Sequence, residues 1–268
     1  MQLPQLFDRL WNDYIKQNPA VRKVYDLLIS EGETIVNDHI AFRTFDDDRV
    51  NIEVLSKAFI KAGYLHVSSY EFEEKHLFAR HFEHPCQKDA PRVFISQLKT
   101  KDFSPFLQQT ITETIDKLSE EILNSPEIIF SRNSWGKPSY DTYMQLLTES
   151  EYAAWVYVFG FRANHFTVSL NSLKKYQDIR DLNKFLQQNS FIINDAGGEV
   201  KGTPEELLEQ SSIRSGVITV EFIEGNYEIP SCYYEFAKRY PDKNGRLYSG
   251  FIAKSADKIF ESTNFYNQ

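Results

Sequence analysis

The stretch from Asn37 to Phe45 carries a histidine and an arginine in a pattern that predicts a short β-strand. Side chains alternate across a strand, so His39, Ala41 and Arg43 share one face and apolar side chains occupy the other. An imidazole and a guanidinium beside a small alanine suit a metal ion and an anionic ligand. A surface strand with a half-buried histidine and a solvated arginine has the same pattern, so this stretch alone leaves both interpretations open.

A second stretch, Ala163 to Leu170, repeats this design. Both stretches place Asn or Asp directly before the histidine, which is His39 in one and His165 in the other. A predicted helix follows each strand and ends about 25 residues beyond the histidine, near Gly63 and near Ser190. These similarities indicate an internal repeat.

An aromatic strand candidate, Cys232 to Ala237, has Glu235 in its middle. An unpaired carboxylate is costly to bury, so Glu235 needs a partner. If both repeats turn strands toward a shared cavity, Glu235 would meet His39 and His165. Two imidazoles and one carboxylate form the facial triad of non-haem Fe(II) oxygenases, which leaves coordination positions for substrate and dioxygen. The three residues lie far apart in the sequence, so spacing alone does not establish the triad.

Other histidines and carboxylates could fill the same roles. Three histidines form a loose cluster: His76, His81 and His84. Their charged setting next to Pro85 favours solvated loop histidines over metal ligands. Glu221 and Glu224 compete with Glu235, but Glu224 lies at a predicted turn, whereas aromatic neighbours indicate burial of Glu235. The sequence contains no GxGxxG, Walker A, GxSxG or HExxH motif, so nucleotide binding, serine hydrolysis and zincin chemistry receive little support.

The elements that would position these residues follow a repeated order. An amphipathic docking helix is predicted over residues 3–15, and the first histidine strand is followed by a helix over 51–62 and about three strands. A long amphipathic helix over 106–122 is predicted as a spacer. In the second half, the residues from Thr203 to Glu206 predict a helix start, and a strand is predicted over 217–223.

We therefore expect a single domain over residues 1–268 that contains two similar modules. Its predicted parts are a first βαβββ-like module at 35–100, a helical connection at 101–160, a second, metal-bearing module at 161–252, and a C-terminal helix at 253–268.

Composition limits the classes of partner. The chain has 268 residues, a formal net charge of -8 and 41% hydrophobic residues, so it is long enough to bury a large core. The acidic balance argues against nucleic acid or an anionic membrane surface as the main partner, although a local basic pocket remains compatible with it. Two cysteines without metal-ligand spacing, the lack of a signal segment and a longest apolar run of Ala153 to Phe161 predict a cytoplasmic protein.

The residues also resemble a known family. The paired histidine modules are similar to the vicinal-oxygen-chelate superfamily, and Val220 to Arg239 resembles the end of the metal-bearing module of 4-hydroxyphenylpyruvate dioxygenase and hydroxymandelate synthase. More closely, three segments resemble the DUF1338 family, whose characterised members are 2-oxoadipate dioxygenase/decarboxylases: His39 to Arg43, Asn164 to Thr167 and Tyr234 to Ala237. The resemblance spans most of the chain, which is shorter than the characterised bacterial members.

This resemblance implies an α+β fold of paired βαβββ modules around a shared metal site, with additional helices. It implies that His39, His165 and Glu235 bind Fe(II) and that Arg43 binds the far carboxylate of the substrate. The implied partners are a 2-oxo acid and dioxygen, and the implied reaction converts 2-oxoadipate to 2-hydroxyglutarate and carbon dioxide. A metal-dependent isomerase, lyase or hydrolase of the same superfamily and a non-catalytic acid-binding protein are the alternatives, and the oligomeric state is left open.

Overall fold

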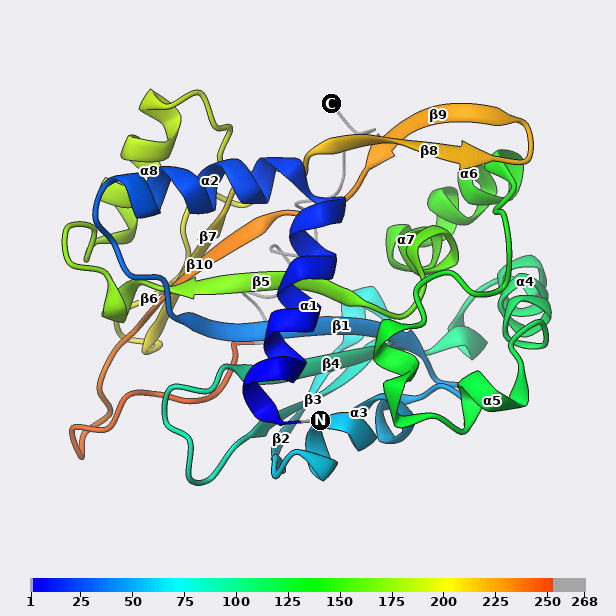
Figure 1. The fold of residues 1–268 in the computed structure, drawn as a ribbon, viewed down its shortest axis with the longest axis horizontal. Coiled ribbons are helices and arrows are strands. Elements are labelled where there is room, and N and C mark those ends of the chain that lie inside the picture. The colour runs from blue at the N-terminus through cyan, green and yellow to red at the C-terminus, as the bar shows by residue number, and fades with distance from the viewer. Residues whose placement is uncertain (1, 253–268) are drawn as a thin grey trace.

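The computed structural model describes residues 2–252. Its centre is an eight-stranded sheet with the order β2-β3-β4-β1-β5-β10-β7-β6. The strands of this sheet are β1 (Asn37–Phe45), β2 (Leu65–Phe72), β3 (Leu77–Glu83), β4 (Arg92–Leu98), β5 (Ala163–Ser169), β6 (Lys201–Thr203), β7 (Leu208–Ser212) and β10 (Tyr234–Arg239). The two histidine strands, β1 and β5, are therefore neighbours in the middle of the sheet (Figure 1).

The two halves of the sheet are related by an approximate twofold arrangement. Strands β1 and β5 pair antiparallel, and each also pairs in parallel with the last strand of its own half, β4 or β10. Ile40 lies opposite Phe166 at the centre, with His39 opposite Thr167 on one side and Ala41 opposite His165 on the other. The predicted internal repeat thus corresponds to two similar half-sheets joined along their histidine strands.

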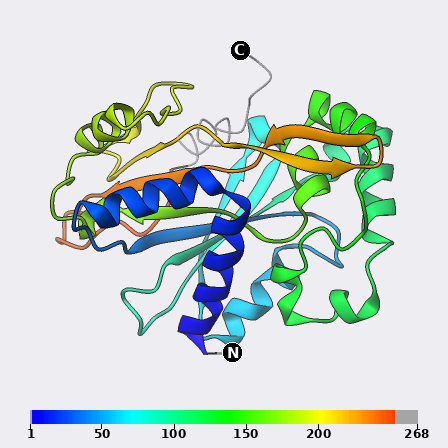
Figure 2. The same cartoon turned by 45° about the horizontal axis from the view of Figure 1, so that its top comes forward.

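Two amphipathic helices cover one face of the sheet. Helix α1 (Leu3–Gln17) buries Leu6, Leu10 and Tyr14, and helix α2 (Pro19–Ser30) follows after a bend at Asn18. Helix α2 begins with Pro19, and Pro4 is the second residue of α1; proline is preorganised for the first turn of a helix. Figure 1 shows α1 crossing in front of the central strands and α2 running above β5 in the view, and Figure 2 shows the same two helices after the turn. The docking helix predicted over residues 3–15 is confirmed.

The first module has the predicted order of one strand, one helix and three strands. Helix α3 (Ile52–Lys61) begins where the Asn51 side chain accepts a hydrogen bond from the Val54 amide. It ends before Gly63, which has φ +97° and lies so close to His84 that a Cβ would come within 2.8 Å of the ring. A side chain there would strain the entry into β2.

The helical connection differs from the single long helix that periodicity predicted. Helix α4 (Pro105–Ile115) stops, and a short helix α5 (Glu120–Leu123) restarts at Ser119, whose hydroxyl accepts from the Ile122 amide. Helices α6 (Tyr140–Glu149) and α7 (Glu151–Phe159) then follow, with Ser150 as the N-cap of α7. The 106–122 prediction was wrong because a serine cap interrupts a continuous apolar stripe.

The second module repeats the first with two differences. Helix α8 (Ile179–Gln188) follows β5 as predicted, but the segment from Thr203 forms a tight turn between β6 and β7 instead of a helix. Pairing of Thr203 with Leu208 commits this segment to a hairpin, so the predicted helix start was wrong. Strand β8 (Val217–Phe222) exists, but it pairs only with β9 (Gly225–Pro230) in a separate two-stranded sheet.

The hairpin β8–β9 packs on the helical connection. The rings of Tyr140 and Tyr227 stack with centroids 3.7 Å apart, and the Ile223 amide donates to the Pro138 carbonyl. Figure 2 shows this hairpin beside the green helices of residues 140–159. The hairpin is therefore separate from the main sheet, in which β10 lies next to β5.

The predicted α+β class with paired βαβββ modules is confirmed by this topology. The module limits at residues 35–100 and 161–252 remain a proposal, and the predicted C-terminal helix at 253–268 lies outside the described residues. Within residues 2–252, no helix is both long and apolar enough to cross a membrane.

Candidate metal centre

Three adjacent strands bring two histidines and one glutamate together. His39 lies on β1, His165 on β5 and Glu235 on β10, and the possible ligand atoms of the three side chains all lie within 4.8 Å of one another. His39 Nε2 is 3.4 Å from Glu235 Oε1, and His165 Nε2 is 3.3 Å from Glu235 Oε2. Within residues 2–252, this is the one group of His, Cys, Asp and Glu side chains placed to hold a metal ion.

Both imidazoles have a partner that orients the ring. The Nδ1 atom of His39 lies 2.9 Å from an Asp38 carboxylate oxygen, and the Nδ1 atom of His165 lies 3.1 Å from the amide oxygen of Asn164. Because these oxygens accept, each Nδ1 is the protonated nitrogen and each Nε2 carries the lone pair. The Thr167 hydroxyl, 3.1 Å away, can donate to His39 Nε2. Both Nε2 atoms therefore face the centre in the form that binds a metal.

The glutamate is fixed from one side only. Gln210 donates to Glu235 Oε1 at 2.5 Å, whereas Glu235 Oε2 is buried and has no hydrogen-bond partner among the described residues. A buried carboxylate oxygen without a donor is costly unless a cation compensates it. One orphaned oxygen beside two imidazole lone pairs therefore fits a divalent metal ion.

Burial shapes the electrostatics of the centre. It raises the pKa of Glu235 to about 8, although the hydrogen bond from Gln210 opposes that change. Burial also lowers the pKa of His39 and lowers the pKa of His165 still more, so both imidazoles are neutral at pH 7. The neutral imidazoles can therefore bind a metal through Nε2. A bound cation would also favour the ionised form of Glu235.

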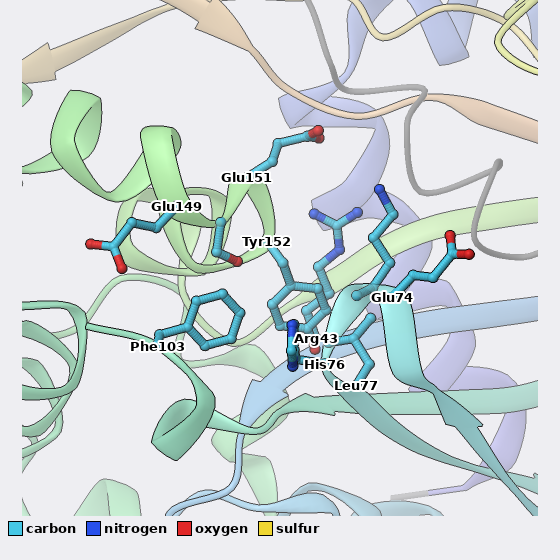
Figure 3. A pocket seen from close by; sticks show the side chains of 10 residues that line it. Arg43, Glu74, His76, Leu77, Phe103, Glu149, Glu151 and Tyr152 are labelled. Carbon is cyan, nitrogen blue, oxygen red and sulfur yellow. The ribbon is translucent and has the colours of Figure 1, made fainter. Parts of the chain in front are cut away.

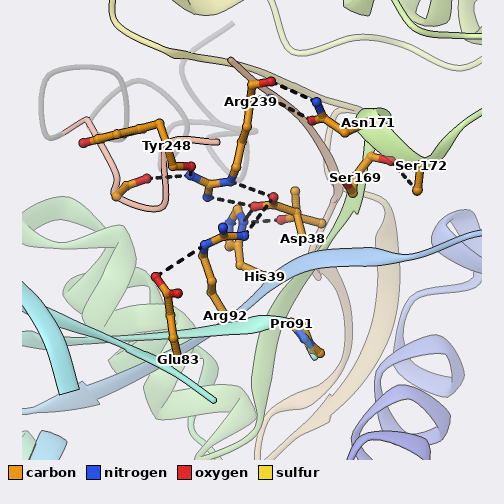
Figure 4. A network of polar contacts seen from close by, with 12 residues as sticks. Asp38, His39, Glu83, Pro91, Arg92, Ser169, Asn171, Ser172, Arg239 and Tyr248 are labelled. Carbon is orange, nitrogen blue, oxygen red and sulfur yellow. Dashed lines mark hydrogen bonds and ion pairs between the residues drawn. The ribbon is translucent and has the colours of Figure 1, made fainter. Parts of the chain in front are cut away.

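A buried ionic network lies behind His39. Arg239 donates to both oxygens of Asp38, at 2.7 and 2.9 Å, and Arg92 approaches the same carboxylate at 3.3 Å (Figure 4). Burial alone would raise the pKa of Asp38, but the charge of Arg239 and these hydrogen bonds hold that pKa well below its usual range. Asp38 is therefore an anion that accepts from His39, and the aspartate before the histidine was the only sequence signal for it.

Arg43 lies further along β1, next to a cavity of about 210 Å³. Only 2% of Arg43 is exposed, and its guanidinium carbon is 5.0 Å from the Tyr152 ring centre and 5.3 Å from that of Trp155. Glu74 and Glu151 line the same cavity (Figure 3). His39, His165 and Glu235 are not among its lining residues, so the cavity lies beside Arg43 and not over the three ligands.

The rival candidates lie elsewhere. Glu221 pairs with Lys137 and Glu224 accepts from Ser139, and both glutamates are exposed. Of the three clustered histidines, His76 is exposed, as predicted. His81 is fully buried on β3, so its assignment as a solvated loop histidine was wrong. It bonds to Tyr70 and Glu83, which occupy both of its ring nitrogens.

Comparisons with known proteins place the chain in a family. The profile of a family described as 2-oxoadipate dioxygenase/decarboxylase matches residues 3–246. A chloroplastic/amyloplastic 2-oxoadipate dioxygenase/decarboxylase from Oryza sativa subsp. japonica is 34% identical over 279 residues, which cover 93% of this chain and 75% of that protein.

Solved structures show the same fold. Hydroxyglutarate synthase from Oryza sativa, in complex with 2-oxoadipate, superposes with a TM-score of 0.90 at 32% identity, over 97% of this chain and 91% of that one. A Shewanella frigidimarina protein, described provisionally as a hydrolase, is 49% identical with a TM-score of 0.88, over 94% of this chain and 98% of that one. A Ralstonia eutropha protein assigned provisionally to the glyoxalase superfamily is 18% identical with a TM-score of 0.73, over 90% of this chain and 83% of that one. This last likeness concerns the fold alone, and it agrees with the predicted vicinal-oxygen-chelate type.

Proposed function

This chain belongs to the 2-oxoadipate dioxygenase/decarboxylase family, as the sequence resemblance predicted, and we propose that it is an Fe(II)-dependent dioxygenase. Its substrate is a 2-oxo dicarboxylic acid. With 2-oxoadipate, one molecule of dioxygen is consumed, and the products are 2-hydroxyglutarate and carbon dioxide. The observation that carries the proposal is the buried group of His39, His165 and Glu235, with the Glu235 Oε2 atom lacking a donor among residues 2–252.

His39, His165 and Glu235 are the proposed metal ligands. Fe(II) held by them would supply a Lewis acid for the 2-oxo acid and a redox centre for dioxygen. Asp38 and Asn164 keep each imidazole in the tautomer with a free Nε2. Gln210 holds one oxygen of Glu235, so the other oxygen is the one available to a metal.

Arg43 is the proposed site for the far carboxylate. It lies four residues along β1 from His39 on the same strand face, and the rings of Tyr152 and Trp155 flank its guanidinium. A guanidinium can form two parallel hydrogen bonds with a carboxylate, which a lysine ammonium cannot reproduce. Support also comes from the rice relative that was solved with 2-oxoadipate.

An oxygen-electrode assay with added Fe(II) tests the proposal. We expect 2-oxoadipate to cause oxygen uptake matched by equal amounts of 2-hydroxyglutarate and carbon dioxide, and no turnover without oxygen. Turnover of a 2-oxo acid under strict anaerobiosis would instead indicate an isomerase, lyase or hydrolase; the Shewanella relative is described provisionally as a hydrolase. Failure to bind a metal in stoichiometric amount would leave a non-catalytic acid-binding protein.

The cellular location remains a prediction. The low cysteine content is the basis for a cytoplasmic assignment. The rice relative is described as chloroplastic/amyloplastic, so the comparisons lend the cytoplasmic assignment no support.

A further inference from the structure

The segment after β10 returns across the sheet and places an aromatic ring against a proposed metal ligand. The Phe251 ring centroid is 4.8 Å from that of His39, at a near-perpendicular angle of 87°. The same ring contacts Phe94 at 4.8 Å, His81 at 5.4 Å and Tyr70 at 5.9 Å. Only 7% of Phe251 is exposed. Phe251 thus fills the space beside His39 on the side of the first module.

The twofold arrangement shows why that space needs filling. Glu235 lies opposite Thr167, and Phe94 lies opposite Ala41, so Phe94 holds the place in the first module that Glu235 holds in the second. Beyond Glu235 the sheet carries the polar side chain of Gln210, whereas beyond Phe94 it carries rings that contact Phe251. A substrate held beside His39 is therefore bounded by Phe251 on one side.

Arg239 fastens this segment to the ligand network. One guanidinium nitrogen donates to the carbonyls of Tyr248 and Gly250, at 2.9 and 2.8 Å. The other two nitrogens donate to Asp38, which accepts from His39. The Phe251 amide also donates to the Tyr70 hydroxyl at 3.2 Å. The position of the Phe251 ring therefore depends on the same arginine that orients the aspartate behind His39.

We propose that Phe251 limits the size of the 2-oxo acid accepted at this centre, and that Arg239 is a positioning residue that holds it there. The proposal rests on the proposed function. With Phe251 in place, a substrate chain can extend along β1 toward Arg43, but it cannot lie over Phe94. A linear dicarboxylate satisfies this restriction, and a 2-oxo acid with an aromatic side chain does not.

The test compares binding of two ligands to the full chain. Wild type and Phe251→Ala are loaded with Fe(II) under anaerobic conditions and titrated calorimetrically with 2-oxoadipate and with phenylpyruvate. We expect the ratio of the two dissociation constants to shift toward phenylpyruvate by about tenfold or more in Phe251→Ala, because a ring-sized space opens. Phe251→Leu should give a smaller shift. Phe78→Ala is the control. Phe78 is a partly buried ring on β3, three residues from His81 and so on the opposite strand face from the ring that contacts Phe251, and its loss should leave the ratio unchanged.

A second variant separates positioning from packing. Arg239→Lys keeps the charge but cannot donate to Asp38 and to two carbonyls together. We expect it to shift the binding ratio in the same direction as Phe251→Ala and also to weaken metal binding. A merely structural role would lower the melting temperature and leave the ratio unchanged.

The outcomes are distinguishable. A wild-type ratio in Phe251→Ala, with metal binding intact, would overturn this inference while leaving the proposed dioxygenase in place. Failure of wild-type protein to bind 2-oxoadipate or to consume oxygen with it would instead overturn the proposed function.

Discussion

The two halves of the sheet have the same architecture but different chemistry. Each half contributes a central strand with an Asx-His pair, Asp38-His39 in one and Asn164-His165 in the other. At the next equivalent positions the halves diverge, because the second has Glu235 where the first has Phe94. Similarly, Arg43 on β1 corresponds to Ser169 on β5. The repeat therefore supplies a symmetric frame, and a few sequence differences between the halves separate the proposed metal ligands from the proposed acid-binding residue.

The difference between Glu235 and Phe94 also explains why only one half of the sheet supplies a carboxylate to the proposed metal centre. A carboxylate at both equivalent positions would place two anions near two histidines, and one of them would lack compensation. The first module instead fills that space with Phe94 and Phe251. Both modules thus contribute a histidine to the proposed metal centre, but the second module alone contributes its carboxylate.

The largest effect is expected from removing the residue that distinguishes the halves. Glu235→Ala should reduce metal affinity by at least about 100-fold and abolish oxygen uptake, because two neutral imidazoles remain as ligands. Metal analysis after dialysis, with parallel oxygen-electrode assays, measures both. Glu221→Ala is the control, since that exposed carboxylate lies on the separate hairpin. Stoichiometric metal retained in Glu235→Ala would refute its role as a ligand.

The two Asx residues should differ in importance. Asp38→Asn should lower metal affinity by about 10- to 100-fold, because His39 loses an anionic acceptor. It should also destabilise the fold by about 3–5 kcal/mol, because the buried Arg239 loses its countercharge.

The matched change Asn164→Ala should have a smaller effect on metal affinity, since a neutral amide is the weaker partner. Competitive metal titration and thermal unfolding of both variants provide the comparison. Equal losses of affinity would show that the two histidines are equivalent in spite of their different partners.

Substitution of Arg43 should weaken substrate binding and leave metal binding unchanged. Arg43→Lys should raise KM for 2-oxoadipate by about tenfold, because paired hydrogen bonds to a carboxylate are lost. Bound iron should remain stoichiometric. Ser169→Ala, the change at the corresponding place of the other half, should leave KM close to the wild-type value. Parallel loss of iron and substrate binding in Arg43→Lys would contradict the assignment of Arg43 to the far carboxylate.

The smallest effect is expected from the residue behind the carboxylate. Gln210→Leu should lower metal affinity by about threefold to tenfold, because Glu235 Oε1 loses its donor and the carboxylate is less well oriented. Competitive titration with a chelator resolves such a difference. An affinity above that of wild type would show that Gln210 withdraws the carboxylate from the metal instead of orienting it.

Local sequence patterns predicted several features of the fold and of the candidate site. Strand alternation correctly placed His39 and Arg43 on one face, and the similarity of the two histidine stretches predicted the repeat that the sheet shows. Burial of Glu235 followed from its aromatic neighbours, and a buried carboxyl group needs partners. These inferences succeeded because side-chain alternation and burial depend on a few consecutive residues.

Pairing between distant segments was decided only in the tertiary structure. The residues from Thr203 to Glu206 predicted a helix start, but Thr203 pairs with β7 and the segment forms a turn. Arg239 and Asp38 are 201 positions apart, and no local pattern links them. Register also decides which face-sharing residues meet, because a shift by one residue would turn Glu235 away from both histidines. The sequence alone therefore determined which residues could do chemistry, and long-range strand register determined which of them meet.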